Sequence, residues 1–115
     1  MSATIRKRLW EPLLLSPSVL TKIYTAPEFV TTQIVVVNAH NWNFLIVTGL
    51  KFLIVKSGGS PTYSTDTLYS DILAQEQTAQ YMQGMILNSG DMIYAIATGS
   101  SVAVNGFGIE ITKGG

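Results

Sequence analysis

The stretch LNSGDMIYAIATGSSVAVNGFGIEIT, residues 87–112, indicates the fold class of this 115-residue chain. Two runs rich in β-branched and aromatic residues, 92–98 and 102–112, each follow a cluster of turn-forming residues. Such residues suit a pleated, half-buried backbone, and Gly, Ser, Asn and Asp suit the turns between strands. We therefore predict that the two runs form an antiparallel hairpin.

The second run changes the parity of its apolar residues. Val102 and Val104 occupy even positions, whereas Ile109 and Ile111 occupy odd ones. Side chains alternate between the two faces of a strand, so a regular strand cannot place both pairs on one face. This predicts a β-bulge or bend between the pairs, where glycine permits unusual backbone geometry. The residues at the predicted bulge are Gly106 and Gly108.

The rest of the chain repeats the pattern of short apolar runs bounded by Gly, Pro, Asn and Ser. This predicts an all-β fold, an antiparallel two-sheet β-sandwich of about eight strands, either jelly-roll-like or immunoglobulin-like, with an extended N-terminal arm. The expected strands are 19–25, 30–38, 43–48, 50–56, 66–73, 78–87, 91–98 and 101–112.

Two of these strands, 43–48 and 50–56, carry nearly continuous apolar residues instead of an alternating pattern. Both faces of such strands need cover. One face belongs to the core, and the other requires the N-terminal arm, a long loop or another subunit.

Residues 71–84, DILAQEQTAQYMQG, allow either a strand or a helix. Ala, Leu, Gln, Glu and Met favour helices, and Ile72, Ala79 and Met82 recur at near-helical spacing. Against a helix, there is no capping box, and Gly84 fits a bend that leads into a strand.

The first 18 residues differ from the others in having a basic cluster, a tryptophan, an apolar triplet and two prolines. Proline favours extended backbone, so we expect an N-terminal arm over 1–18 and a sandwich domain over 19–115. The arm either packs along its own domain or reaches a neighbour. On the second alternative, a chain without 1–18 would fold but no longer dock. The residues expected to dock are Arg6, Lys7, Arg8, Trp10, Leu13, Leu14 and Leu15.

Charge is scarce, which points to assembly. Charged residues make up 12% of the chain, apolar residues make up 47%, and the net charge is zero. Little repulsion then separates copies, and apolar surface remains to be covered. We expect a homo-oligomer; a well-buried monomer with a neutral polar surface is the alternative.

Membrane insertion and export are not expected. The apolar runs are shorter than the roughly 20 residues that a spanning helix needs. The basic N-terminus and the following LWEPLLL resemble a signal peptide, but Glu11 and Pro12 interrupt the apolar run and no cleavage site follows.

The residues that usually carry chemistry are sparse. His40 is the only histidine and cysteine is absent, so one copy offers no ordinary zinc site and no nucleophilic triad with a G-x-S-x-G motif. Seven carboxylates are scattered without calcium-loop spacing, and no glycine-rich stretch has the P-loop pattern. We expect no enzymatic activity, no metal and no cofactor.

Two features leave room for ligands. Arg6, Lys7 and Arg8 include three of the seven basic residues. With zero net charge, a nucleic-acid track is not expected, and an acidic patch on a neighbouring protein is the favoured partner. Trp42, between Asn41 and Asn43, forms either a lid over the sandwich end or a platform on which a sugar stacks.

Several segments in order resemble small β-sandwich virion proteins of tailed bacteriophages. They are IYTAP at 23–27, VN at 37–38, the stretch from Leu87 through Ala95, and VAVNGFGIEIT at 102–112. The resemblance spans 19–112 and leaves the arm outside it. The Gln-rich residues 75–83 depart from the pattern, which puts strand pairing there in doubt.

This resemblance implies a structural virion component assembled in the host cytoplasm. A capsid decoration or cement protein, docked on the head lattice beside the major capsid protein, is the first expectation. A tail, neck or fibre accessory protein is the second. The third, a carbohydrate- or receptor-binding module, comes from Trp42 with Asn41 and Asn43 and not from the resemblance.

Overall fold

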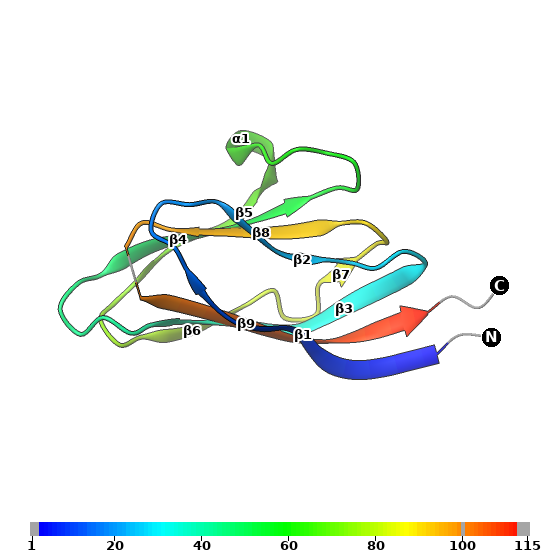
Figure 1. Ribbon diagram of the computed structural model, residues 1–115, viewed down its shortest axis with the longest axis horizontal. Coiled ribbons are helices and arrows are strands. Elements are labelled where there is room, and N and C mark those ends of the chain that lie inside the picture. The colour runs from blue at the N-terminus through cyan, green and yellow to red at the C-terminus, as the bar shows by residue number, and fades with distance from the viewer. Residues whose placement is uncertain (1–2, 100, 113–115) are drawn as a thin grey trace.

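The computed structural model describes residues 3–99 and 101–112, which form two packed antiparallel sheets (Figure 1). The first sheet contains β1 (Ala3–Leu15), β3 (Val30–Asn41), β6 (Thr78–Tyr81), β7 (Ile86–Leu87) and β9 (Val102–Thr112). The second sheet contains β2 (Thr21–Thr25), β4 (Thr48–Val55), β5 (Thr67–Leu73) and β8 (Met92–Ala97). The short helix α1 (Tyr63–Asp66) lies outside the second sheet. The predicted β-sandwich is confirmed.

The strand order is that of a jelly roll. The first sheet runs β1-β9-β3-β6, with β7 also paired to β3, and the second runs β2-β8-β4-β5. Four antiparallel strand pairs are nested along the chain. The innermost is β4–β5, and it is enclosed in turn by β3–β6, β2–β8 and β1–β9. The chain is therefore one long hairpin wrapped into two sheets, which is the double-sheet alternative among the predicted sandwiches.

The segment expected as an arm is an edge strand of its own domain. Within residues 1–18, β1 pairs with β9 from Ala3↔Thr112 to Leu15↔Val102. Leu9 and Leu15 are buried in the core, and Trp10 packs against it. The first alternative for this segment, packing along its own domain, therefore describes residues 3–15.

Strand β9 keeps one parity throughout, so the predicted switch at Gly106 and Gly108 is wrong. Its even-numbered residues from Val102 to Glu110 are buried, and its odd-numbered residues face outward. Ile109 and Ile111 lie on the outer face, and the acidic Glu110 between them lies inside. The register does shift at this level, but the extra residues are in the neighbouring strands: Leu9 in β1 and Val35 in β3.

The two glycines of β9 are required by what packs on them. A Cβ atom at Gly106 would lie 2.3 Å from Cη2 of Trp10. One at Gly108 would lie 2.7 Å from the carbonyl oxygen of Gln33 and 2.9 Å from Cδ1 of Leu9. The missing side chains therefore make room for two consecutive apolar residues of β1, which both point into the sandwich because of the bulge at Leu9. The Trp10 indole nitrogen donates to the carbonyl oxygen of Val104.

The second apolar face of β4 is covered by a loop. Leu50 and Phe52 lie in the main core, whereas Leu53 and Val55 lie outside that core cluster but are almost completely buried. Residues 56–66, including α1, run over this side of the second sheet (Figure 1), and Gly59 lies against the Val55 side chain. Of the three kinds of cover expected for residues 50–56, the structure has the long loop.

Three expected elements need correction. Residues 42–47 form a loop, so the predicted strand at 43–48 is wrong; β3 continues instead to Asn41. The predicted strand at 78–87 is two strands, because Met82 and Gly84 have positive φ and the chain turns between them. Residues 71–84 contain the end of β5 and all of β6, and no helix.

Candidate functional site

Residues 42–47, called the apolar loop from here on, form the most exposed apolar segment of the described chain. The loop connects β3 to β4 at the left-hand end of the molecule in Figure 1. Its five large apolar side chains are each between 51% and 72% exposed. They are Trp42, Phe44, Leu45, Ile46 and Val47. Such a cluster marks a contact surface more often than a scattering of single apolar residues does.

Two asparagine side chains hold the apolar loop in place. Asn41 is fully buried, and its Nδ2 donates to the carbonyl oxygens of Ile46 (3.0 Å), Leu73 (3.3 Å) and Ala74 (3.2 Å). Its Oδ1 accepts from the backbone N–H of Asn43, whose own Oδ1 accepts from the N–H groups of residues 45 and 46. These bonds explain why an apolar sequence turns here instead of extending. Both side-chain polar atoms of Asn41 and the Oδ1 of Asn43, residues expected at a ligand or rim, are therefore engaged within the chain.

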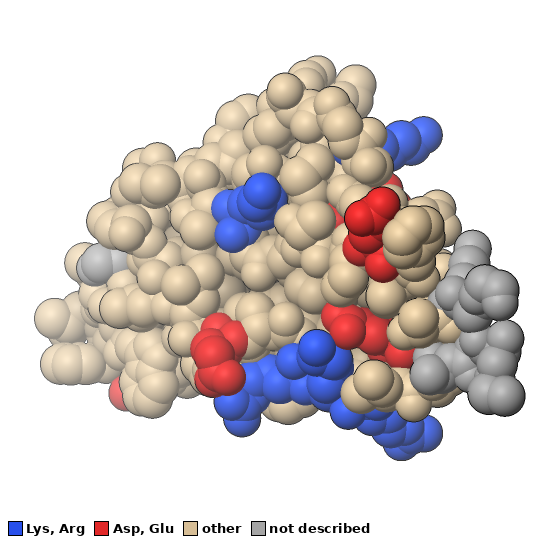
Figure 2. All heavy atoms as spheres, turned by 45° about the vertical axis from the view of Figure 1, so that its right-hand side comes forward, with Lys and Arg blue, Asp and Glu red and all other residues tan. Residues whose placement is uncertain are grey.

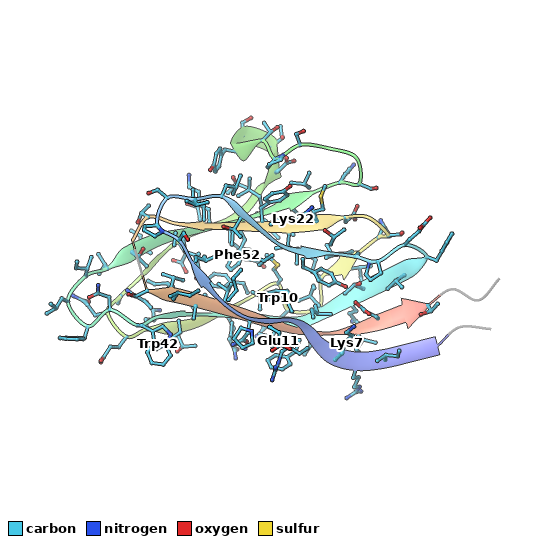
Figure 3. All side chains as sticks on the ribbon, in the orientation of Figure 1. Lys7, Trp10, Glu11, Lys22, Trp42 and Phe52 are labelled. Atoms are coloured by element: carbon cyan, nitrogen blue, oxygen red, sulfur yellow. The ribbon has the colours of Figure 1, made fainter. Side chains whose placement is uncertain are left out.

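Trp42 is 63% exposed and does not lid the sandwich. Figure 3 shows it at the loop end of the molecule. The ring of His40 meets it edge-on, with centroids 4.7 Å apart and planes at 82°. His40 Nδ1 also shares a hydrogen bond with Thr78 Oγ1. The indole is thus available on the surface, and its histidine neighbour is oriented by β6.

A hollow of about 320 Å³ lies on the outer face of the second sheet, next to the apolar loop. Its floor includes Gly49, which directly follows Thr48 at the start of β4, and its far wall is Tyr63 of α1. The lining includes one cationic and one anionic residue, Lys51 and Asp71, and Lys51 Nζ lies 5.6 Å from the centre of the Tyr63 ring. Ile72, 68% exposed, also lines the hollow and is the penultimate residue of β5.

The outer face of the first sheet is the other exposed apolar region. Val35, Ile86 and Phe107 are each exposed there, and Val36, Ile109 and Ile111 are partly exposed beside them. A second hollow, of about 350 Å³, lies between Val35 and Phe107 on one side and residues 6–8 on the other.

The expected docking residues of β1 divide into an exposed group, which includes the basic residues, and a group that packs on the core. Lys7 Nζ lies 3.2 Å from Glu110 Oε1, and Arg8 Nη1 lies 3.0 Å from Glu11 Oε2. Blue groups gather along the lower side of Figure 2, with red groups beside them. Leu15 is buried, and Trp10 and Leu13 pack against the core. The exposed members are the basic residues and Leu14.

A buried polar network, not anticipated from the sequence, joins the two sheets. The Tyr24 hydroxyl of β2 donates to Glu110 Oε2 (2.7 Å) and lies 2.8 Å from Thr32 Oγ1. Burial, and to a lesser extent the neighbouring Glu110 carboxylate, raises the pKa of Tyr24 well above its usual range. One residue in the sequence could have indicated this network. Glu110 is an acidic residue at an even position, so it lies on the same buried face of β9 as Val102 and Val104.

Among the described residues, no group of three or more His, Cys, Asp or Glu side chains could hold a metal ion. The Tyr24 hydroxyl is kept protonated, and the Glu110 carboxylate is bound by Tyr24 and Lys7. In the same part of the chain, no helix has the length and apolarity to cross a bilayer.

No protein-family model matches the sequence, and no curated protein is similar to it. Solved structures with a similar fold include a chain from Bacillus endospore appendages, described as a family of disulfide-linked pili. It has 9% identity and a TM-score of 0.50 over 96% of this chain and 88% of that one. A chain of the T13 viral particle of IBDV has 6% identity and a TM-score of 0.51, over 96% of this chain. This chain spans 30% of the length of that viral chain. At such identities the likeness shows the fold alone.

Proposed function

We propose that this protein is a non-enzymatic structural subunit that assembles in many copies on a particle. The observation that carries this proposal is the presence of two exposed apolar regions on different parts of one rigid domain. These are the apolar loop at one end and the outer face of the first sheet. A simple dimer needs one contact surface, whereas a lattice subunit needs at least two, one for its own copies and one for the particle.

Rigidity supports the same role. The apolar loop is held by buried asparagine bonds, and the core strands are paired along their length. A preformed surface loses little conformational entropy on docking, so more of the contact energy appears as affinity. Many copies on a lattice then gain further by avidity.

The comparisons fit an assembled structural protein. One similar chain comes from pili and another from a viral particle. The pili are described as disulfide-linked, but this chain has no cysteine. Its assembly would therefore be non-covalent and would depend on apolar contacts.

The specific proposal is a capsid decoration protein of a tailed bacteriophage. It is supported by the order of the segments at 23–27, 37–38, 87–95 and 102–112, which resembles small virion proteins of these phages. A tail, neck or fibre position is the alternative within the same class. The outer face of the first sheet, with Phe107, Val35 and the nearby Arg6, would contact the particle.

The test uses particles made by the phage genome after the gene for this chain has been deleted from it. Purified protein should bind these particles saturably and appear as repeated two-sheet density in images of the particle. Phe107→Glu should abolish binding, because it would bury a charge in an apolar contact. Phe29→Glu is the matched control, since Phe29 is also exposed but lies in the β2–β3 turn. Absence of saturable binding by the wild type would refute the virion role.

The exposure of Trp42 favours a second candidate, a sugar-binding module. Exposed indoles stack on sugar rings, but the side chain of Asn41 and the Oδ1 of Asn43 are occupied by loop hydrogen bonds. A glycan array decides the question: a signal that Trp42→Ala removes supports this candidate, and a blank array excludes it for the glycans tested.

A further inference from the structure

We infer that the outer face of the first sheet binds a neutral oligosaccharide at the end of the sheet nearest the apolar loop. The site combines the exposed indole of Trp42 with amide side chains of β6, β3 and β9. This inference rests on the second candidate function, the sugar-binding module, and it adds where the sugar lies and which groups hold it. Val35, Phe107 and Arg6, which are proposed to contact the particle, lie toward the other end of the same face.

The indole of Trp42 is held in place but is not covered. Figure 3 shows it on the side of the first sheet that faces away from the second sheet. The imidazole of His40 meets it edge-on, and the backbone N–H of Trp42 donates to the carbonyl oxygen of Ser101 (2.8 Å). An edge-on contact covers at most one of the two faces of the indole, and Trp42 remains 63% exposed. The indole can therefore stack on the C–H groups of a sugar ring.

An amide row extends across the sheet beside the indole. It consists of Gln80 in β6, Asn38 in β3 and Asn105 in β9, which are paired side by side in the strand register. The residues on either side of Asn38 and Asn105 are buried, so these two side chains face outward, as does the exposed Gln80. From the strand rise and spacing, the row lies about 13 Å along the chain from Trp42 and is about 10 Å wide. The surface is therefore long enough for a chain of sugar rings.

Each amide of the row has one atom engaged and another available. Asn38 Nδ2 donates to Asn105 Oδ1 at 3.0 Å, which fixes the orientation of both amides. Gln83 Nε2 donates to Gln80 Oε1 at 3.1 Å. Within residues 3–99 and 101–112, no group bonds to Asn38 Oδ1, Asn105 Nδ2 or Gln80 Nε2. The row thus presents donors and an acceptor side by side. A sugar hydroxyl both donates and accepts, so neighbouring hydroxyls of a sugar match this arrangement.

The charges around the site favour a neutral sugar over an acidic one. The indole, the imidazole and the amide row contribute no carboxylate, lysine or arginine. At the β1 border, Arg8 and Glu11 neutralise each other, with Nη1 and Oε2 3.0 Å apart. At the β6 border, Glu76 lies shortly before Thr78 and would repel an anionic sugar.

Titration of the full chain with defined sugars, followed by ¹H–¹⁵N correlation spectra, tests the site. The neutral probes are maltotriose, cellotriose and triacetylchitotriose, and sialyllactose is the acidic comparison. At least one neutral probe should saturably shift the signals of residues 38–42, 78–80 and 103–105, and sialyllactose should shift them less. Absence of saturable shifts with every neutral probe overturns the inference.

Two substitutions test the assigned groups. Trp42→Ala should raise the dissociation constant of the bound sugar by about 10-fold or more, because stacking is lost. Gln80→Ala removes one hydrogen bond and should raise it by about 3- to 10-fold. The matched controls are Phe29→Ala, an exposed aromatic residue in the β2–β3 turn, and Gln33→Ala, on the same face toward its other end. Both should leave the constant unchanged, and thermal denaturation confirms that each variant is folded.

The outcomes separate this site from both proposed functions. A sugar that binds Trp42→Ala as tightly as the wild type, or that shifts signals elsewhere on the domain, overturns the site but keeps the sugar-binding function. Sugar binding that Trp42→Ala and Gln80→Ala both weaken supports the site even if the protein binds no particle. A protein that binds particles but none of the neutral probes refutes this inference and leaves the particle role standing.

Discussion

Gly106→Ala should destabilise the protein through one contact, the Trp10 indole that lies on this glycine. An added Cβ would come within 2.3 Å of Cη2 and 2.5 Å of Cζ3 of the ring. Real Cβ contacts lie beyond 3.0 Å, so the ring must move by about 1 Å or more. The indole also packs against Tyr24, with ring centroids 6.0 Å apart, and donates to Val104, so movement disturbs both contacts.

Overpacking of this kind costs about 1–3 kcal/mol, and we expect the upper part of that range because the ring is held on several sides. For a domain of this size the melting temperature should fall by about 3–6 °C per kcal/mol. Trp10→Leu removes the obstructing ring atoms. In that background Gly106→Ala should be nearly neutral or slightly stabilising, since alanine loses less backbone entropy than glycine.

Chemical denaturation of the four proteins of this double-mutant cycle measures the coupling between residues 10 and 106. We expect about 2 kcal/mol. Gly49→Ala is the control, because its Cβ would lie 3.3 Å from the Thr98 side chain and needs only a small adjustment. Equal costs of Gly106→Ala with and without Trp10 would refute the packing described for β1.

Three further predictions concern the interior. Burial raises the pKa values of Tyr24 and Tyr81 above the ordinary 10.0, so the unfolded state loses these protons first as the pH rises. Above pH 10 the free energy of unfolding should therefore fall by about 1.4 kcal/mol per pH unit for each tyrosine. Tyr24→Phe should reduce this slope in alkaline denaturation curves. Asn41→Asp replaces a donor that faces three carbonyl oxygens with an acceptor. We expect limited proteolysis to cut the variant within 42–47 and to leave this loop intact in the wild type, and equal cleavage of the two would contradict the anchoring role. Deletion of residues 1–15 removes the buried Leu9 and Leu15 together with Trp10, so the product should lose its cooperative thermal transition, whereas a folded product would restore the expectation of a dispensable arm.

The sequence predicted the strand-rich sandwich correctly because alternation and turn residues are local signals. It misplaced the ends of β3 and β4, because the turn at 42–47 is produced by Asn41 bonding to Leu73 and Ala74 about 30 residues away. Local propensity contains no information about such partners. The apolar run at 44–47 was therefore interpreted as a strand, although it is the most exposed part of the candidate site.

The parity error in β9 has a similar origin. Ile109 and Ile111 were assumed to face inward because they are apolar, yet the inward position is taken by Glu110, which Tyr24 and Lys7 satisfy. A buried acid is predictable only when its partners are known, and these lie in β2 and β1. The glycines at 106 and 108 were expected to form a bend, whereas in the structure they allow close packing of the neighbouring strands.

The position of β9 has a consequence for synthesis of the chain on the ribosome. This strand lies between β1 and β3 and pairs with both, while β1 and β3 do not pair with each other. Until residues 102–112 leave the exit tunnel, the first sheet lacks its middle member and the nascent chain cannot close. Closure of this sandwich must therefore wait for β9, and the apolar faces of the earlier strands stay exposed to chaperones until this strand inserts.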